Sequence, residues 1–538
     1  MLMDASPVRQ LIEDAAPKAP HPEVTALPDA SDLGILNTYV GHFDGHTIND
    51  NRDMLRMGKK QAFIRNFRPL SALSFALILQ ATWEFISNTQ GLVNGGYAGL
   101  FWSYVWTLIG FAFVIFSLAE MASMAPISGG QYHWVSEFAP PQYQKFLSYV
   151  TGWMSVLAWQ AGAASGSFLT GTIIQGLVTL NYPNYVSTNW KGTLLVFAMV
   201  ALIYFFNIWV AQEIPMIQNI LLVIHVFGFL AVILVLWTMA PRNSVEKVFT
   251  EFSNGGGWPT LGVSLMIGQI SAIYGSLSVD ATAHMAEEVK DAARNVPRAI
   301  AWGYLGNGIL GLVLIITYLF ALPSIQDAIK HPTGFPFMYV FSNAVSTRGV
   351  NALTSIILIL VIASNITFNA SASRQTFSFA RDNGLPFSKW LSTVHPKKHI
   401  PANAVLISCL ISGLLALINL GSTTAFNAII SLNVGALMFS YAVSIACVLH
   451  RRVYYPQLLP PVYWSLGKRV GPVLNGIALL YALFAFFWSF WPQETPVNAT
   501  NFNWSVVIFT GVLTMSLVMY FVRGKRVYSG PVTSVTGR

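Results

Sequence analysis

Long runs of hydrophobic residues, separated by short polar segments, make up the chain from about residue 70 onward. Each run has about the 20 residues that a helix needs to cross a bilayer. The pattern therefore predicts an all-α polytopic membrane protein with twelve transmembrane helices. The predicted spans cover residues 70–92, 98–119, 146–171, 192–210, 215–239, 260–286, 300–321, 351–379, 402–420, 425–449, 471–491 and 504–522.

Both ends of the chain are more polar than the spans. Residues 1–69 contain no apolar segment that could serve as a signal peptide, and Pro, Asp and Ala are frequent in their first part. This composition predicts a mostly disordered, cytosolic N-terminal tail. A short cytosolic tail, residues 523–538, is expected after the last span.

Composition and charge agree with a membrane protein. Hydrophobic residues make up 54% of the chain and charged residues only 10%, against about 25% in soluble domains. The net charge of +8 would suit a nucleic-acid partner, but 24 of the 30 Lys and Arg residues fall on one side of the predicted membrane. This asymmetry predicts that both termini are cytoplasmic and disfavours nucleic acid. The two cysteines, Cys409 and Cys447, lie in apolar segments and indicate neither a disulfide nor a metal site.

The first span contains a carboxylate, which is costly inside a bilayer and therefore a candidate for function. Glu84 lies in the sequence ATWEFIS, together with Thr82, Trp83 and Ser87. A helix broken at this point would turn these groups toward a substrate cavity. Glu84 would then pair with an ammonium or quaternary ammonium group, and Trp83 would add a cation–π contact. The alternative is a structural carboxylate, close to the outer boundary or protonated and hydrogen-bonded within the bundle.

The sixth span contains a second candidate break, in the sequence YGSLSVD. Gly275 lowers the barrier to leaving helical geometry, and the neighbouring Ser276 and Ser278 can satisfy freed backbone groups. Together with Tyr274, this stretch is predicted to bind the polar ends of a small zwitterion. Asp280 lies deeper toward the cytoplasm and is expected to act in gating or packing. The alternative is close helix packing at Gly275, with Asp280 in a structural ion pair.

Further polar residues lie in other spans. His225, in the middle of the fifth span, is a candidate for proton coupling because imidazole titrates near neutral pH; the alternative is a core histidine with satisfied partners. Trp159 and Gln160 begin the small-residue segment AWQAGAASGS of the third span. Close packing is expected there, with both side chains able to reach the cavity. Arg374, in the eighth span, is expected to face the bundle or to extend toward the cytoplasm.

The charged sequence EEVKDAARNVP follows the sixth span. The pairs Glu287–Lys290 and Asp291–Arg294 have i,i+3 spacing, which predicts a solvated helical turn. We find no catalytic constellation, phosphate loop or metal-ligand pattern in the sequence. An enzyme, an ATP-driven pump, a cofactor and a metal site are therefore not expected.

The two candidate broken helices are five spans apart, and an odd number of spans inverts the topology of a second copy. This predicts inverted repeats at residues 70–239 (helices 1–5) and 260–449 (helices 6–10), with helices 11 and 12 added at residues 471–522. Broken helices at corresponding positions of two halves indicate a transporter site at the interface between the repeats.

An unusual mixture of residues separates the second and third spans. Pro126, Gly129 and Gly130 predict a sharp turn on the cytoplasmic side, followed by Gln131 and Tyr132. These residues are expected to form an inner gate or a connector between the second and third helices.

Three motifs give the chain a resemblance to a known family. The sequences AEMASMAPISGGQYHWVSEFAP, AHMAEEVKDAARNVPRAI and SFARDNGLPFSKW resemble the fungal amino acid/choline transporter family, which includes GABA and choline permeases. This family belongs to the amino acid–polyamine–organocation (APC) superfamily. The resemblance extends from about residue 58 to about residue 520.

The resemblance implies the five-plus-five inverted-repeat fold of the bacterial leucine transporters. It implies a substrate site between broken helices 1 and 6, here Thr82–Ser87 and Tyr274–Asp280. Some superfamily members carry a lysine in helix 5 that replaces a sodium ion. This chain has none in that span, and His225 is the stand-in we consider.

We therefore expect a secondary active transporter that imports a small amino acid, GABA or a choline-like amine, coupled to protons. The substrate and protons would be its partners, together with the lipid bilayer. An amino acid exchanger and a non-transporting nutrient receptor are the alternatives. The plasma membrane is the expected location, and the vacuolar membrane is the alternative.

Overall fold

The computed structural model describes residues 46–84, 90–420 and 425–531. Across these ranges the regular structure is helical, with two isolated backbone bridges and no strand. Ten helices within the described ranges are long and apolar enough to cross a bilayer, so the chain is a multi-pass membrane protein. Short 3₁₀ or π turns extend several of them. These helices are α6 (Gly96–Met124), α8 (Pro141–Asn181), α9 (Asn189–Trp209), α10 (Ile214–Met239), α15 (Ala292–Ala321), α18 (Thr347–Arg381), α20 (Ala402–Ala416), α21 (Ala425–Tyr454), α22 (Val470–Trp488) and α23 (Ser505–Met519).

The first predicted span is interrupted. It begins with α4 (Pro69–Gln80), which has proline at its first position, where no backbone N–H is needed. Helix α4 stops at Ala81, whose φ of 45° lies in the left-handed region. Residues 85–89 lie outside the described ranges, and α5 (Gln90–Val93) follows them. The discontinuity predicted around Thr82 and Glu84 is therefore present.

The sixth predicted span is interrupted as well. It contains α12 (Leu261–Gly268), then α13 (Ile270–Tyr274) and, after a non-helical stretch, α14 (Ala281–His284). Gly275 follows the last residue of α13, and Ser278 adopts a left-handed φ of 69°. The second predicted discontinuity is therefore also present, in the YGSLSVD sequence.

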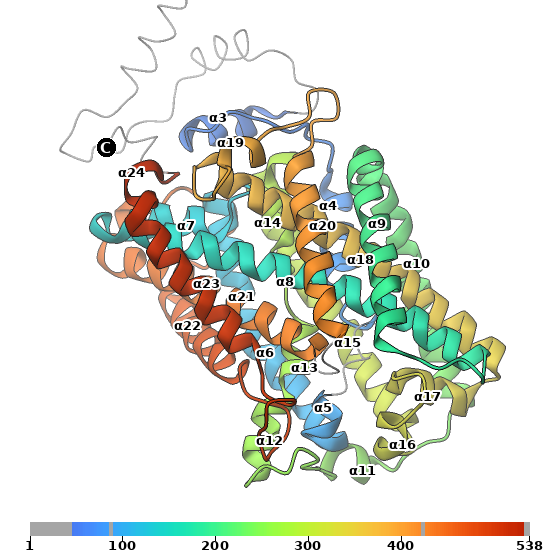
Figure 1. Ribbon diagram of the computed structural model, residues 1–538. Helices are drawn as coiled ribbons and strands as arrows, with labels where there is room; N and C mark the ends of the chain where they lie inside the picture. The colour runs from blue at the N-terminus through green and yellow to red at the C-terminus, as the bar shows by residue number, and fades with distance from the viewer. Residues whose placement is uncertain (1–45, 85–89, 421–424, 532–538) are drawn as a thin grey trace, which may run out of the picture.

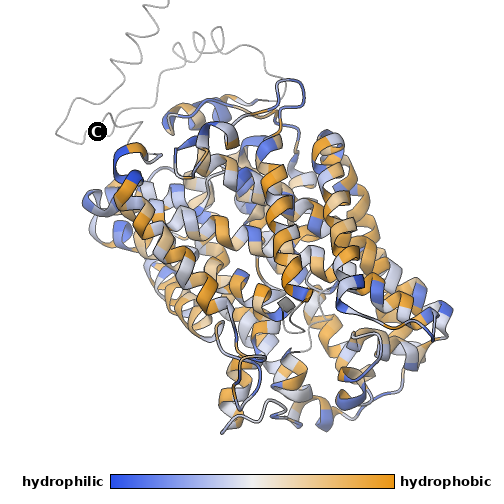
Figure 2. Cartoon of the chain, viewed as in Figure 1, coloured by the Kyte–Doolittle hydropathy of each residue, from blue (hydrophilic) through white to orange (hydrophobic). Residues whose placement is uncertain are grey.

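The helices form one bundle around α8, which packs against α7 (Gln131–Phe138), α9, α18, α20 and α21. One end of the bundle, called here the α3 end, carries α3 (Ile48–Arg56), α19 (Ser388–Leu391) and α24 (Lys525–Val527). The opposite α12 end carries α11 (Val245–Thr250), α12 and α16 (Ile325–Ile329) (Figure 1). Hydrophobic residues cover the outward faces of α9, α10, α20 and α23 between these ends (Figure 2). This distribution is that of a lipid-facing surface.

The small residues of α8 allow neighbouring helices to approach closely. A Cβ on Gly162 would lie 2.3 Å from Phe368 Cζ, and a Cβ on Gly152 would lie 2.2 Å from Phe379 Cε2. Both aromatic rings come from α18, so side chains of α18 fill the space that the glycines leave. The close packing predicted for this helix is therefore confirmed.

Residues 46–68 are folded, which corrects the prediction of a mostly disordered tail for this part; residues 1–45 lie outside the described ranges. Thr47 caps α3 by accepting from the Asp50 N–H at 3.1 Å. The Asp50 carboxylate in turn accepts from the N–H groups of Asp291 and Ala292, at 2.9 and 3.0 Å, at the start of α15. Phe67 exchanges two backbone hydrogen bonds with the segment Glu288–Lys290. The segment is therefore attached to the bundle by its own backbone and side chains.

An ion pair connects α3 to α7. Arg56 lies 2.8 Å from Glu137. Burial alone would raise the pKa of Glu137, but the charge of Arg56 and the nearby His133 lower this pKa to about 2. The carboxylate therefore stays ionised at neutral pH, and the pair keeps its charge.

The acidic sequence after the sixth span is not the solvated turn predicted for it. Glu287 and Glu288 are buried, and each pairs with an arginine of α18: Arg381 at 2.8 Å and Arg374 at 2.7 Å. Only the Asp291–Arg294 pair, at 3.7 Å, is solvent-exposed as expected. Arg374 does face the bundle, and its partner is 86 residues away in the sequence.

Candidate functional site

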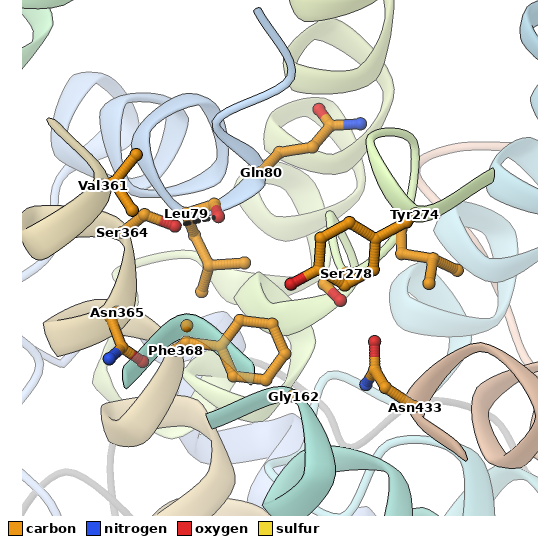
Figure 3. Close-up of a pocket in the computed structure, with 12 residues that line it drawn as sticks. Leu79, Gln80, Gly162, Tyr274, Ser278, Val361, Ser364, Asn365, Phe368 and Asn433 are labelled. Carbon is orange, nitrogen blue, oxygen red and sulfur yellow. Dashed lines mark hydrogen bonds between the residues drawn. The ribbon is translucent and has the colours of Figure 1, made fainter. Parts of the chain in front are cut away.

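A cavity lies where the two interrupted helices meet. Leu79 and Gln80 reach it from the end of α4, and Tyr274 and Ser278 reach it from the end of α13 and the stretch that follows (Figure 3). Helices α8, α18 and α21 complete the wall. The other lining residues are Gly162, Gly166, Leu277, Val361, Ser364, Asn365, Phe368 and Asn433.

The cavity is small and contains no formal charge. Its volume of about 20 Å³ compares with the 10–15 Å³ that one water molecule needs on the same measure. None of the twelve lining residues is acidic or basic. Amide, hydroxyl and aromatic groups surround the space, so recognition here relies on hydrogen bonds and ring faces. A solute of several heavy atoms requires the lining side chains to move apart.

Gln80 holds the two breaks together. Its amide nitrogen donates to the Ser276 carbonyl at 3.1 Å, and its amide oxygen accepts from Asn307 of α15 at 3.2 Å. The Ser364 hydroxyl of α18 donates to the Leu79 carbonyl at 2.6 Å. A helix end that is buried without such partners would be costly. The sequence therefore supplies donors at the positions where the interruption of α4 leaves carbonyls unpaired.

The stretch after α13 positions the residues predicted there in different ways. Tyr274 and Ser278 line the cavity, and the Tyr274 hydroxyl lies 2.9 Å from that of Ser165 on α8. The Ser276 hydroxyl donates to the Ala272 carbonyl within α13, at 2.9 Å. Gly275 has no atom closer than 3.7 Å to the position of a Cβ, so close packing does not require glycine at this position.

Glu84, Trp83 and Thr82 lie outside the cavity lining. The Glu84 carboxylate is 2.7 Å from His225 Nδ1 of α10, and both side chains are fully buried. The Trp83 indole N–H is 3.1 Å from the same nitrogen, and its ring packs against Phe229. The Thr82 methyl carbon faces Gly311 of α15. The structure thus brings together two residues predicted for different tasks, Glu84 and His225. Ser87 lies outside the described residues.

Trp159 and Gln160 of α8 lie next to the cavity without lining it. The Trp159 ring packs between Phe368, which lines the cavity, and His284 of α14, at centroid distances of 4.8 and 4.7 Å. The Gln160 amide donates to Thr376 at 3.0 Å and to Ser408 at 2.8 Å, which ties α8 to α18 and α20.

Asp280 lies in a hydrogen-bonded cluster at the start of α14. One carboxylate oxygen accepts from the Gln131 amide at 2.6 Å and the other from the Tyr441 hydroxyl at 2.5 Å. Tyr132, the next residue of α7, instead donates to Asp382 at 2.9 Å. The stretch after α13 is thereby tied to α7 and α21, and no ion pair forms at Asp280 among the described residues.

The turn before α7 depends on glycine. Gly130 has a φ of 54°, and a Cβ there would lie 2.7 Å from His284 Cε1. His284 Nδ1 approaches the Ser128 carbonyl at 2.8 Å. The predicted sharp turn is therefore present, and it fits around the end of the interrupted sixth span.

Several cavity residues had no signal in the sequence that marked them. Asn433 is one of two asparagines in the largely apolar α21, Phe368 is one of 36 phenylalanines, and Gly162 is one of several small residues in α8. Asn365 belongs to a visibly polar stretch of α18 and was recognisable as bundle-facing. The described residues contain no group of three His, Cys, Asp or Glu side chains that could hold a metal ion.

Comparisons with known proteins identify the family. The family model described as amino acid permease matches residues 66–513. A choline transporter of Saccharomyces cerevisiae is 28% identical over 471 residues, which cover 86% of this chain and 82% of that protein. The GABA-specific permease of the same yeast is 26% identical over 500 residues, which cover 91% of this chain and 87% of that protein.

A solved structure agrees on the fold. The manganese transporter of Eremococcus coleocola, in complex with an aromatic bis-isothiourea substituted compound, superimposes with a TM-score of 0.51 at 13% identity. The match covers 87% of this chain and 94% of that one. It supports the all-α, five-plus-five inverted-repeat fold; the exact repeat boundaries at residues 70–239 and 260–449 stay a prediction. The chain is a transporter and not an enzyme: it belongs to the amino acid permease family, within the APC superfamily.

Proposed function

We propose that this permease imports a small amino acid, GABA or a choline-like amine by proton-coupled alternating access around its two interrupted helices. The observation that carries the proposal is the uncharged, polar cavity at the junction of α4 and α13. The names of the two yeast relatives, a choline transporter and a GABA-specific permease, support an amine as the substrate.

The direction of the helices favours a cation in this cavity. Both α4, which ends at Gln80, and α13, which ends at Tyr274, present their C-terminal ends to it. The C-terminal end of a helix carries a partial negative charge, so it attracts an ammonium group without any acidic side chain. The residues with direct contact to substrate would be Tyr274 and Ser278. Four further residues lie outside the cavity lining and would support these contacts indirectly: Thr82, Trp83, Trp159 and Gln160.

We assign proton coupling to the Glu84–His225 pair. His225 Nδ1 has one position for a hydrogen, yet it faces both the Glu84 carboxylate at 2.7 Å and the Trp83 N–H at 3.1 Å. With a hydrogen on Nδ1, the ring donates to Glu84; without it, the ring accepts from Trp83 or from a protonated Glu84. Gain or loss of one proton therefore changes how the break after α4 is attached to α10.

Glu84→Gln tests this assignment. We expect uptake by the variant to lose most of its dependence on external pH, because the amide cannot take up the proton. The maximal rate should fall by about tenfold or more, the usual scale for removing a proton-transfer group. Initial uptake rates between pH 4.5 and 7.5 measure both effects. Thr354→Val, which removes a buried hydroxyl of α18 and no ionisable group, is the control. An unchanged pH profile for Glu84→Gln would contradict the assignment.

The Asp280 cluster is our candidate for gating. Gln131 of α7 and Tyr441 of α21 hold the Asp280 carboxylate, so movement of α14 away from these two helices requires the hydrogen bonds to break. Asp280→Asn keeps the shape but weakens both contacts, since hydrogen bonds to a charged group are the stronger ones. We expect this variant to expose a cysteine introduced at Ser128 to thiol reagents faster than the same cysteine in the unchanged background.

Radiolabelled uptake tests the function itself. Cells that lack their own permeases, expressing the full chain, should accumulate GABA, choline or a neutral amino acid against a gradient, and an uncoupler should abolish this accumulation. Uptake that requires a preloaded internal amino acid would indicate an exchanger. Binding without uptake would indicate a receptor. Accumulation that persists without a proton gradient would rule out proton coupling.

The orientation and the membrane are part of the proposal. Both described ends of the chain lie at the α3 end of the bundle, and the excess of Lys and Arg favours the cytoplasm for that end. We place the protein in the plasma membrane. A fluorescent tag at the C-terminus should mark the cell periphery, and the tag should resist protease added to intact cells.

A further inference from the structure

Asn433 of α21 presents an unpartnered oxygen to the cavity. Its amide nitrogen donates to the Ala158 carbonyl of α8 at 2.8 Å, which fixes the orientation of the amide. The oxygen points from the lower wall toward Ser278 and Tyr274 (Figure 3). The side chain is only 1% exposed, and no hydrogen bond to this oxygen is formed by the described residues. Because this oxygen faces the cavity and no described donor occupies it, it can accept a hydrogen bond from a bound solute.

The other asparagine of the cavity differs from Asn433, because its amide is satisfied within the protein. The Asn365 side chain can pair both its nitrogen and its oxygen with α8. Its nitrogen donates to the Ala163 carbonyl at 3.1 Å. Its oxygen then accepts from the N–H and hydroxyl of Ser167, at 2.7 and 2.9 Å. Both polar groups of the Asn365 amide are thus paired within the protein, whereas the Asn433 oxygen remains available to a ligand.

Ser278 gives an independent indication of a ligand at the same place. It is the cavity-lining residue with a left-handed φ, 69°, although it carries a side chain that disfavours this conformation. Its hydroxyl forms no hydrogen bond within the described part of the chain. Strained backbone is typical of sites where a side chain must be held in a particular place. The strain here holds an uncommitted hydroxyl at the cavity opposite Asn433.

We infer that Asn433, together with Ser278, selects substrates that carry a primary ammonium group over those that carry a trimethylammonium group. This inference rests on the proposed function and narrows its substrate class. A primary ammonium has three N–H donors for the Asn433 oxygen, the Ser278 hydroxyl and the helix ends. A trimethylammonium has none, and it would leave the Asn433 oxygen unpaired.

The remaining walls agree with this selection. Recognition of quaternary ammonium groups relies on cages of several aromatic rings. Among the described residues, only two rings, Tyr274 and Phe368, line this cavity, and Trp83 is held against His225 and Phe229 on α10. The cavity of about 20 Å³ is also tight around Gly162 and Gly166, which favours the smaller headgroup.

Three matched pairs of substrates test the inference in cells lacking their own permeases. Each pair differs only by N-methylation: GABA and its N-trimethyl derivative, glycine and glycine betaine, ethanolamine and choline. In every pair that is transported, we expect the primary amine to have a KM lower by about 10- to 100-fold, the range for hydrogen bonds to a charged group. Equal or better uptake of a trimethyl member would overturn the inference. Uptake of none of the six would overturn the proposed function, and the inference with it.

Variants of Asn433 separate recognition from folding. Asn433→Leu should bring the KM ratio within each pair close to one, mainly by raising the KM of the primary amine. Asn433→Asp keeps an acceptor oxygen and should retain the preference. Asn475→Leu is the matched control, because Asn475 is an equally buried amide that bonds a neighbouring helix, Ser117 at 2.9 Å, away from the cavity. If Asn433→Leu left the ratio unchanged, or if Asn475→Leu reduced it equally, the role of Asn433 would be structural. If Asn433→Leu fails to reach the membrane, the KM ratios of the wild type and of Asn433→Asp still test the inference.

Discussion

Arg374→Met should remove most of the folded protein from the membrane. Arg374 Nε lies 2.7 Å from Glu288, its second nitrogen lies 3.4 Å from the other carboxylate oxygen, and the two side chains are 1% and 9% exposed. Loss of one partner of a buried ion pair leaves the other charge without compensation. Such a loss costs about 3–5 kcal/mol, a large part of the stability of most domains.

The measurement is the fraction of tagged protein that elutes as a single species in detergent, and its midpoint of thermal aggregation. Arg374→Met combined with Glu288→Met should recover much of the loss, because the apolar pair removes both charges together. Arg294→Met is the matched control, because Arg294 lies 3.7 Å from Asp291 and its side chain is 47% exposed. We expect this variant to lose about 0–1 kcal/mol of stability. If the single Arg374→Met variant were as stable as wild type, the ion pair with Glu288 would not be needed for the stability of the folded protein.

Gly162→Ala should abolish most transport while the protein remains folded. The added Cβ would lie 2.3 Å from Phe368 Cζ and 2.8 Å from Asn433 Nδ2. Both neighbours line the cavity, so the ring and the amide must move into a space of about 20 Å³. Inserting one methyl group into a close-packed interior costs about 1–3 kcal/mol. The displaced groups should lower the initial uptake rate by about tenfold or more.

Gly476→Ala provides the comparison for this substitution. Gly476 is also within a helix, α22, but a Cβ there has no atom within 4 Å. Alanine favours helix over glycine by about 1 kcal/mol, so this variant should be at least as stable as wild type and should transport normally. Uptake rates divided by surface expression measure the effect for both variants. Normal uptake by Gly162→Ala would show that Phe368 can yield away from the cavity.

The sequence was sufficient for the membrane helices and for the places where two of them stop. Span length and the low frequency of charged residues set the ten long helices, because a bilayer demands about 20 apolar residues from each. The breaks after Gln80 and Tyr274 were also readable, because polar residues and glycine in a span need backbone that is not regular helix. These features depend only on neighbours in the chain.

The assignment of side chains to the cavity depended on the tertiary structure. Helical periodicity ends at the left-handed Ala81, so the direction of Glu84 cannot be extrapolated from α4, and it contacts His225 of α10. Asn433 lies 155 residues from Ser278 in the chain. The partners of Glu287 and Glu288 are likewise distant.

Local pattern thus determined the approximate positions of the long apolar helices and the places where two further spans are interrupted. It did not determine which polar groups meet. Hydrogen bonds and ion pairs are short-range, so their partners are fixed only when helices remote in sequence pack together, here α8, α10, α18 and α21 around the two breaks.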